Sequence, residues 1–201
     1  MDKGINNNGF EYVDLGLPSG TLWAAMNVGA SKASDYGLYF QWGDTIGCTK
    51  DQVGKDKQFN WSDYKWNPSG DRDTFTKYKT TGATLELEDD AANKNMGGDW
   101  HMPTPEQIQE LIDNTISTWT TKDGVIGKLF TSKNGNSIFI PAAGNAWDGS
   151  VNGSESYGSF WSSMLNPSSV SHGQNLNFYS SYVVLDYDDR YGGLSVRGVN
   201  G

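Results

Sequence analysis

The stretch WHMPTPEQI, residues 100–108, contains the clearest local folding signal in the chain. Thr104 is a good helix N-cap, Pro105 suits the first helical position, and Gln107 stands where its side chain completes a capping box. The signal predicts a helix from Pro105 to Asn114. Its apolar residues fall on one face at helical spacing: Ile108, Leu111 and Ile112.

On both sides of this helix the sequence is strand-like. Apolar and aromatic residues occur in short runs bounded by Gly, Pro, Ser or Asn, as in strands joined by tight turns. A second, short helix is expected within residues 84–92. The predicted fold class is α+β, with short strands near residues 12–15, 22–24, 125–126, 129–130, 137–141, 160–163, 175–178, 182–185 and 194–197.

The length of 201 residues suits one domain with a sizeable core. Residues 1–9 are polar, lack the apolar centre of an export signal, and are expected to form a flexible arm before a single domain at 10–201. Residues 44–82 are expected to form a long surface excursion pinned by its aromatic residues, Trp61, Tyr64 and Trp66. Five large residues are expected in the core: Trp23, Trp42, Trp100, Trp119 and Trp161.

Composition excludes several function classes. The chain has 15 basic against 24 acidic residues and a net charge of -9, which argues against a nucleic-acid partner. It has one Cys, Cys48, and two His, His101 and His172, too few for a zinc site rich in Cys or His. No apolar run approaches the length of a transmembrane helix.

The last quarter of the chain differs in composition from the rest. Residues 151–201 hold 11 Ser, against 9 in residues 1–150, and half of the 10 Tyr, but no Lys. Tyr offers rigid contact area, and Ser, Asn and Gly offer adaptable hydrogen bonds, as in antibody paratopes. The alternative is that Ser and Asn only fill the loops between strands.

Several strings together resemble a known family. The helix start at 100–108 resembles the R-L-P-T-E-x-E-W string of formylglycine-generating-enzyme-like domains, and GLSVRGV (193–199) resembles their closing strand. Further strings resemble a group of Bacteroidetes surface proteins with this domain: YVDLGLPSGTLWA (12–24), NVGA (27–30), FQWG (40–43) and NSIFIPAAG (136–144). The resemblance spans about Tyr12 to Val199 and implies a C-type-lectin-like fold.

Within that group, residues 158–199 resemble the variable segment of proteins diversified by retroelements. The resemblance implies a constant framework and exposed ligand-binding positions whose Asn codons are altered at adenines, which excludes Lys, Glu, Gln, Met and Trp. All the candidate ligand-binding positions satisfy that restriction: Ser159, Asn166, Ser168, Ser169, Ser171, His172, Asn175, Tyr179, Tyr182, Val184, Asp186, Tyr187, Asp188, Asp189 and Tyr191. Strand alternation predicts that Val183 and Leu185 point inward and that Tyr182, Val184 and Asp186 point outward, so that one surface forms from 159–191.

The enzymatic alternative is weaker. Formylglycine-generating enzymes use a Cys pair for their metal, and this chain has only Cys48. His172 has no nucleophile and orienting acid that the sequence makes evident. We therefore expect no catalytic residues and no cofactor. Calcium is a lesser alternative, through one of two oxygen-rich sets: Asp186, Asp188 and Asp189, or Asn145, Asp148 and Ser150.

The sequence thus predicts a non-enzymatic ligand-binding protein, extracellular, on a bacterial cell surface or a phage particle. Its expected partner is a protein or a cell-surface glycan, with no nucleic acid and no transmembrane segment. A constant adhesin or carbohydrate-binding module of the same fold stays open as an alternative. An oxidoreductase related to the formylglycine-generating enzymes is a third and weaker one.

Overall fold

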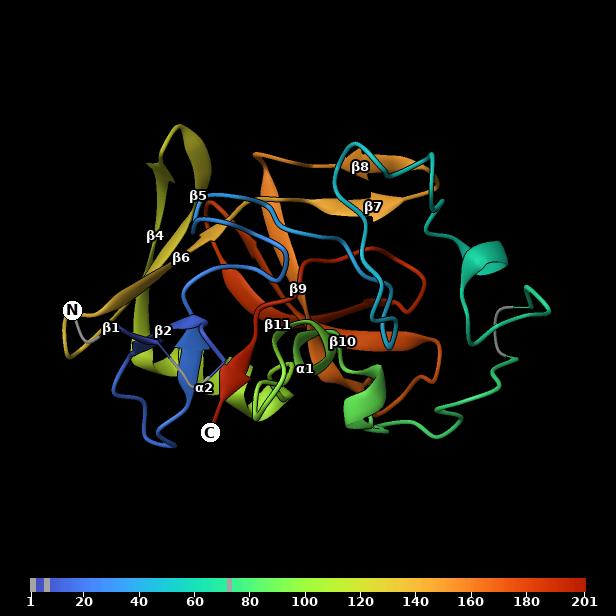
Figure 1. Cartoon of the computed structure of the whole chain (residues 1–201), viewed down its shortest axis with the longest axis horizontal. Helices are drawn as coiled ribbons and strands as arrows, with labels where there is room; N and C mark the ends of the chain where they lie inside the picture. The colour runs from blue at the N-terminus through green and yellow to red at the C-terminus, as the bar shows by residue number, and fades with distance from the viewer. Residues whose placement is uncertain (1–2, 6–7, 72–73) are drawn as a thin grey trace.

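The computed structural model describes residues 3–5, 8–71 and 74–201. In this part of the chain the fold is mostly β, with two short helices and four small antiparallel sheets (Figure 1). The helices are α1 (Ala91–Met96) and α2 (Pro105–Asn114), and short 3-10 turns occur at Trp61–Asp63 and Leu87–Asp89. The helix expected at 105–114 is therefore present, and so are the expected short strands up to residue 185. The strand expected at 194–197 is not formed: Leu194 and Ser195 make only isolated bridges, to Phe40 and Phe160. The second helix begins later than expected, after the 3-10 turn.

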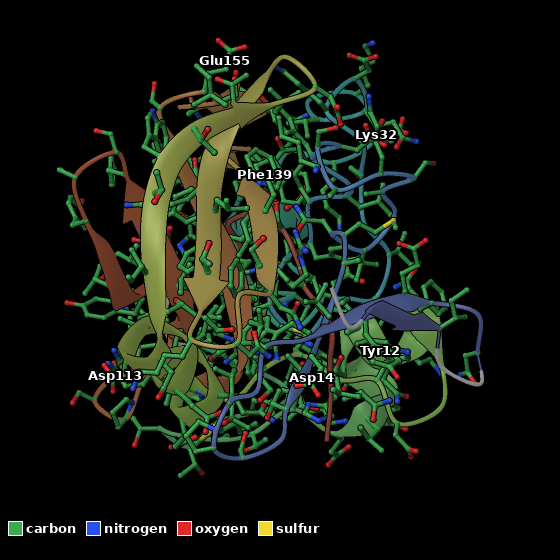
Figure 2. The ribbon with its side chains drawn as sticks, turned by 90° about the vertical axis from the view of Figure 1, so that its left-hand side faces the viewer. Tyr12, Asp14, Lys32, Asp113, Phe139 and Glu155 are labelled. Carbon is green, nitrogen blue, oxygen red and sulfur yellow. The ribbon has the colours of Figure 1, made fainter. Side chains whose placement is uncertain are left out.

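Three of the four sheets consist of strands that follow one another in the chain. Three strands form the sheet that carries most of the candidate ligand residues, in the order β11-β10-β9: β9 (Tyr157–Leu165), β10 (His172–Tyr179) and β11 (Val183–Asp189). A second sheet is formed by β4 (Thr115–Lys122), β5 (Val125–Ser132) and β6 (Ser137–Pro141) and faces the viewer in Figure 2. A small hairpin consists of β7 (Asn145–Trp147) and β8 (Ser150–Asn152).

The fourth sheet joins both ends of the chain. Its order is β1-β2-β3-β12, from β1 (Lys3–Ile5), β2 (Glu11–Asp14), β3 (Leu22–Ala24) and β12 (Val199–Asn200). The expectation of a flexible arm over 1–9 is thus wrong for β1, whose backbone pairs with β2 in antiparallel register. Residues 1–2 and 6–7 of the expected arm lie outside the described residues.

The core lies on both sides of β9. On one side, Phe160 packs with Leu176 and Phe178 of β10 and with Ile108 and Leu111 of α2. On the other side, a second cluster joins three of the expected core tryptophans to Phe40 and the 194–196 segment: Trp42, Trp100 and Trp161. These three and Trp23 are fully buried, whereas Trp119 is half-buried against the first cluster. The sheet that carries the candidate site is therefore fixed from both faces along β9.

The excursion at 44–82 is pinned by aromatic residues, as expected, and it is also pinned by an arginine. Tyr64 is buried, and Trp61 is half-buried against Tyr191 with ring centroids 4.4 Å apart. The fully buried Arg190 donates to the Tyr64 hydroxyl at 2.8 Å and to the Tyr78 carbonyl at 3.0 Å. The residue at the end of β11 thus fastens the excursion to the candidate site. No helix in the described residues is long and apolar enough to span a membrane.

Helix α2 begins as the capping signal predicts. The Thr104 hydroxyl accepts from the Gln107 N–H at 3.2 Å, and the Gln107 side chain accepts from the Thr104 N–H at 2.9 Å. We expect Thr104→Ala to lower the free energy of unfolding by about 1 kcal/mol, because it leaves a helix-end donor without a partner. Thermal unfolding measures this effect. A melting temperature equal to that of the wild type would show that the cap contributes nothing.

Candidate functional site

The two faces of the β9–β10–β11 sheet differ because side chains alternate along each strand. Val183 and Leu185 are half-buried against the first core cluster, while Tyr182, Val184 and Asp186 are exposed. The exposed fractions of Tyr182 and Val184 are 49% and 40%. The predicted orientation of these five side chains is therefore confirmed.

The register between β10 and β11 divides the candidate residues between two surfaces of the sheet. Asp186 lies opposite Asn175, and Val184 lies opposite Asn177, so these residues share one face of the sheet. We call the surface formed with their neighbours the tyrosine face, and it comprises Tyr157, Asn175, Asn177, Tyr179, Tyr182, Val184, Asp186 and Asp188. The opposite surface, the histidine face, comprises His172, Tyr187 and Asp189. The single surface expected over 159–191 is in fact two.

Three tyrosines stack on the tyrosine face. The Tyr157 and Tyr179 rings are stacked, with centroids 5.1 Å apart and planes inclined by 29°. The Tyr182 ring lies 5.0 Å from that of Tyr179, at 30°. Tyr157 is not among the residues predicted from the sequence, since it lies 22 residues before Tyr179 and only the pairing of β9 with β10 brings the two together. The stack forms a continuous aromatic surface from a buried strand to an exposed turn.

A buried lysine from another sheet holds the turn that carries this stack. Lys128 on β5 is 2% exposed, and its ammonium donates to the carbonyls of Tyr179 at 2.7 Å, Ser180 at 3.4 Å and Tyr182 at 3.0 Å. Burial lowers the pKa of Lys128. The three carbonyl dipoles face the ammonium and fix the β10–β11 turn, so the rings of Tyr179 and Tyr182 are presented by a rigid backbone.

Carboxylates gather at the other end of the tyrosine face. Burial raises the pKa of the Asp188 carboxyl to about 6, and the negative charges of Asp189 and Asp186 act in the same direction. A hydrogen bond from Asn145 opposes this shift. The Asn145 side chain also accepts from the Tyr157 hydroxyl at 2.9 Å, which links the tyrosine stack to the acidic end.

Two buried amide oxygens on this face have no hydrogen-bond partner. They are the Oδ1 atoms of Asn175, which is 1% exposed, and of Asn177. Most buried polar atoms are paired, so an unpaired acceptor on a rigid strand requires an explanation. In the β10–β11 register the two asparagines lie opposite Asp186 and Val184, on the face that also carries Asp188.

The histidine face contains an arrangement that the sequence did not reveal. The Ser169 hydroxyl lies 2.7 Å from Nδ1 of His172, and Nε2 of His172 lies 3.4 Å from the Asp189 carboxylate. The ring of Tyr187 meets that of His172 edge-on at 5.3 Å. A serine, a histidine and an acid in contact are the elements of a nucleophilic triad.

Local geometry gives these contacts a structural explanation. The Ser169 hydroxyl accepts from the Ser171 N–H at 3.3 Å and lies 3.0 Å from the Ser171 hydroxyl, as in a serine-stabilised turn. His172 begins β10, three residues after Ser169, so the short connection alone brings the two together. The hydroxyl is thus already engaged by the turn, and we assign it a role in ordering the loop.

Four candidate residues are buried, contrary to expectation: Ser159, Ser171, Asn175 and Tyr191, with exposed fractions of 2%, 4%, 1% and 7%. Ser159 is covered because Ser195 pairs alongside β9, donating its N–H to the Ser159 carbonyl at 3.3 Å. Tyr191 packs between Trp61 and Trp147.

The burial of the other two has different causes. The Ser171 carbonyl accepts from the Arg190 N–H at 3.0 Å, which draws it inward. Asn175 lies beside Trp161 in the β9–β10 register. Gly173, two residues before Asn175 on the same face of β10, is also covered by the core: a Cβ added there would lie 2.7 Å from the Trp42 ring. Tyr191→Ala should destabilise the fold, because the Tyr191 ring packs between Trp61 and Trp147.

The loop between β9 and β10 holds the remaining candidates. Ser168 is exposed, and Asn166 is half-buried, with its Oδ1 accepting from the Ser168 N–H at 2.8 Å. The Asn166 N–H donates to the His172 carbonyl at 2.9 Å, which closes the loop. Only Ser168 of this pair offers a free surface for contact.

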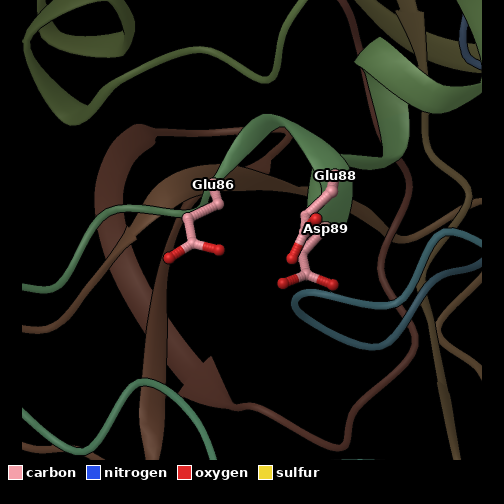
Figure 3. A group of neighbouring side chains, drawn as sticks. All are labelled: Glu86, Glu88 and Asp89. Carbon is pink, nitrogen blue, oxygen red and sulfur yellow. The ribbon is translucent and has the colours of Figure 1, made fainter.

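The geometry of acidic residues bears on the cation alternative. In the described part of the chain, one acidic triple brings its oxygens within 4.8 Å of one another: Glu86, Glu88 and Asp89 (Figure 3). The Lys77 ammonium contacts all three carboxylates, so the space between them already holds a cationic group of the protein. The carboxylates of the predicted set, Asp186, Asp188 and Asp189, do not form such a group. Burial raises the pKa of the Cys48 thiol, which disfavours the reactive thiolate.

Two cavities open on another side of the molecule. Their volumes are about 440 and 380 Å³, and both are lined by Glu11, Met26 and Ser31. The second also touches Phe139 on β6 and Lys32 on the loop after β3, both labelled in Figure 2. None of the candidate ligand residues lines either cavity. Searches with the chain among family models, curated proteins and solved structures found no match.

Proposed function

We propose that the chain is a non-enzymatic ligand-recognition domain of C-type-lectin-like fold, and that it binds its ligand on the tyrosine face. One observation carries the proposal. Seven large hydrophobic side chains are exposed in the described part of the chain, and two of them lie together on the tyrosine face, on or beside the edge strand β11: Tyr182 and Val184. Clustered exposed apolar side chains on a rigid scaffold are typical of interaction sites.

The distribution of candidate positions agrees with a diversified protein displayed on a bacterial surface or a phage particle. Val184, Asp186 and Tyr182 project from a sheet whose opposite side is packed against α2, so they can change without disturbing the core. A protein ligand suits this surface, since tyrosine contacts dominate many protein interfaces. Burial of Ser159, Ser171, Asn175 and Tyr191 removes these four from the set of direct contacts.

A constant carbohydrate-binding module of the same fold is the second candidate. The stacked rings of Tyr157, Tyr179 and Tyr182 favour it, because flat aromatic surfaces also pack against sugar rings. The neighbouring DNA distinguishes the two. A reverse transcriptase gene and a near-copy of the coding segment for 158–199 that differs at adenines would support diversification.

A binding series tests the site. We would select binders for the whole chain from a phage-displayed peptide library and measure their affinity for variants. Tyr182→Ala should weaken binding by about 1 kcal/mol or more, as for an aromatic anchor, while stability changes by no more than about 0.5 kcal/mol. The matched control is Ile116→Ala, an exposed apolar residue on β4. If the selected binders are insensitive to Tyr182 and Val184 but lose affinity for the Ile116 variant, the tyrosine face is not the site.

A further inference from the structure

We infer that the tyrosine face takes a cationic nitrogen group, the ammonium of a lysine or the guanidinium of an arginine on a protein ligand. The cation would lie between the carboxylates of Asp186 and Asp188 and the rings of Tyr179 and Tyr182. The inference rests on the proposed function, because it names the chemistry that the same surface selects.

The acids of this face lack an internal counterion. Neither Asp186 nor Asp188 forms an ion pair within the described part of the chain. No lysine follows Lys133 in the sequence. The two arginines of this region, Arg190 and Arg197, are fully buried and donate to neutral oxygens elsewhere. An arriving cation therefore meets carboxylates that have no ion-pair partner among the described residues.

Lys128 is the cation nearest to the turn, and it is not available to these acids. The residue as a whole is 2% exposed. Its ammonium donates hydrogen bonds to the carbonyls of Tyr179, Ser180 and Tyr182. It thus fixes the turn from behind while the tyrosine rings and the carboxylates face outward. The positive charge of Lys128 is thus buried behind the β10–β11 turn, and the tyrosine face keeps the negative charges of Asp186 and Asp188.

The tyrosine rings supply the second element of cation recognition. The face of an aromatic ring attracts an ammonium or guanidinium within about 6 Å of its centroid, and guanidinium groups also stack on it. The half-exposed Tyr182 ring extends the Tyr157–Tyr179 stack to the solvent. A long lysine or arginine side chain can pack its methylene groups on Val184 while its charged end reaches Asp186.

The third element is the pair of unpartnered amide oxygens. Asn175 is 1% exposed, and its Oδ1 lies on the strand position opposite Asp186 without any donor. Asn177 Oδ1 is in the same situation opposite Val184. Both oxygens are acceptors that the fold leaves without a donor, and the sheet holds them in place before any ligand arrives. This observation is independent of the carboxylates.

Titration of Asp188 should make binding depend on pH. The groups that face it are Asp186 and Asp189 on β11, Tyr179 on β10, Tyr157 on β9 and Asn145 on β7. Burial raises its pKa to about 6, so the carboxyl is mostly neutral below that pH and charged above it. A cation binds the charged form more tightly. Affinity should therefore rise between about pH 5 and pH 7.5.

The test uses three short peptides and the whole chain labelled with nitrogen-15. The peptides are acetylated and amidated Gly-Gly-X-Gly-Gly, in which X is lysine, arginine or norleucine; norleucine keeps the methylene groups and lacks the ammonium. We expect saturable shifts of the Asn175 and Asn177 side-chain amide signals with the lysine and arginine peptides. The norleucine peptide should cause none.

Charge-removing variants complete the test. Asp186→Asn and Asp188→Asn should each weaken lysine-peptide binding by about two- to fivefold, the range for a partly exposed ion pair. Asp188→Asn should also abolish the pH dependence. Asp51→Asn, which removes the same charge from an exposed turn elsewhere, should change nothing.

Three outcomes would overturn the inference: equal shifts with norleucine, no shifts with any peptide, or saturable shifts with calcium chloride that displace the lysine peptide. These outcomes are separable from a failure of the proposed function. Selected binders that need Tyr182 but contain no lysine or arginine would support the tyrosine face as the binding site and would contradict the inference that it binds a cationic group. Binders that ignore Tyr182 and Val184 would refute the site itself.

Discussion

Trp161→Ala is expected to destabilise the fold by about 3–5 kcal/mol, the cost of emptying a large aromatic site in a packed core. Trp161 is fully buried, and its indole N–H donates to the Phe40 carbonyl at 2.7 Å. Its removal leaves a cavity between the β9–β10–β11 sheet and the second core cluster and frees a buried carbonyl. Since a domain has about 5–15 kcal/mol of stability, this loss is a large fraction of the total.

Urea unfolding followed by tryptophan fluorescence and circular dichroism measures the loss. Tyr182→Ala, at the exposed end of the same sheet, is the control and should unfold like the wild type. If both variants unfolded together, the tyrosines would belong to the core and the tyrosine face would not be a free surface. If neither variant lost stability, the packing of Trp161 would not support the sheet.

Arg190→Leu is expected to cost at least about 3 kcal/mol, because it leaves several buried acceptors without donors. The guanidinium donates to the Tyr64 hydroxyl and to the carbonyls of Lys77, Tyr78 and Val170. It also lies over the Phe75 ring, 4.1 Å from the centroid. Without it, the excursion at 44–82 loses its attachment to the end of β11.

Arg190→Lys is the informative companion variant. It keeps the charge, but one ammonium cannot reach acceptors on both sides of a planar guanidinium, so it should recover little stability. Limited proteolysis should cut both variants within residues 64–82 before global unfolding. Wild-type resistance of this segment in Arg190→Leu would mean that the aromatic contacts of Trp61 and Tyr64 hold the excursion alone.

The candidate site was partly predictable from strand periodicity. The alternation of Val183 and Leu185 with Val184 and Asp186 depends only on neighbours along one strand, and the structure confirms it. Periodicity does not say which strands pair. The division into a tyrosine face and a histidine face follows from the β10–β11 register, and the addition of Tyr157 to the stack follows from the β9–β10 register.

The burial of Tyr191 illustrates why exposure was the least predictable property. In sequence it follows an acidic turn and precedes two glycines, a context typical of a surface loop. In the structure it is enclosed by Trp61, which lies 130 residues earlier, and by Trp147. No local signal reports such a partner, because it is brought there by the path of the excursion.

The sequence by itself determined the features whose causes are local. The start of α2 at Pro105 depends on a cap and a capping box within four residues, and the inward side of β11 depends on alternate residues. The tertiary structure alone decided which side chains remain exposed and what supports them. Lys128 fixes the tyrosine turn from another sheet, and β1 pairs with β2 where a free arm was expected. Capping and alternation act between near neighbours, whereas burial and register depend on contacts that form only when distant strands meet.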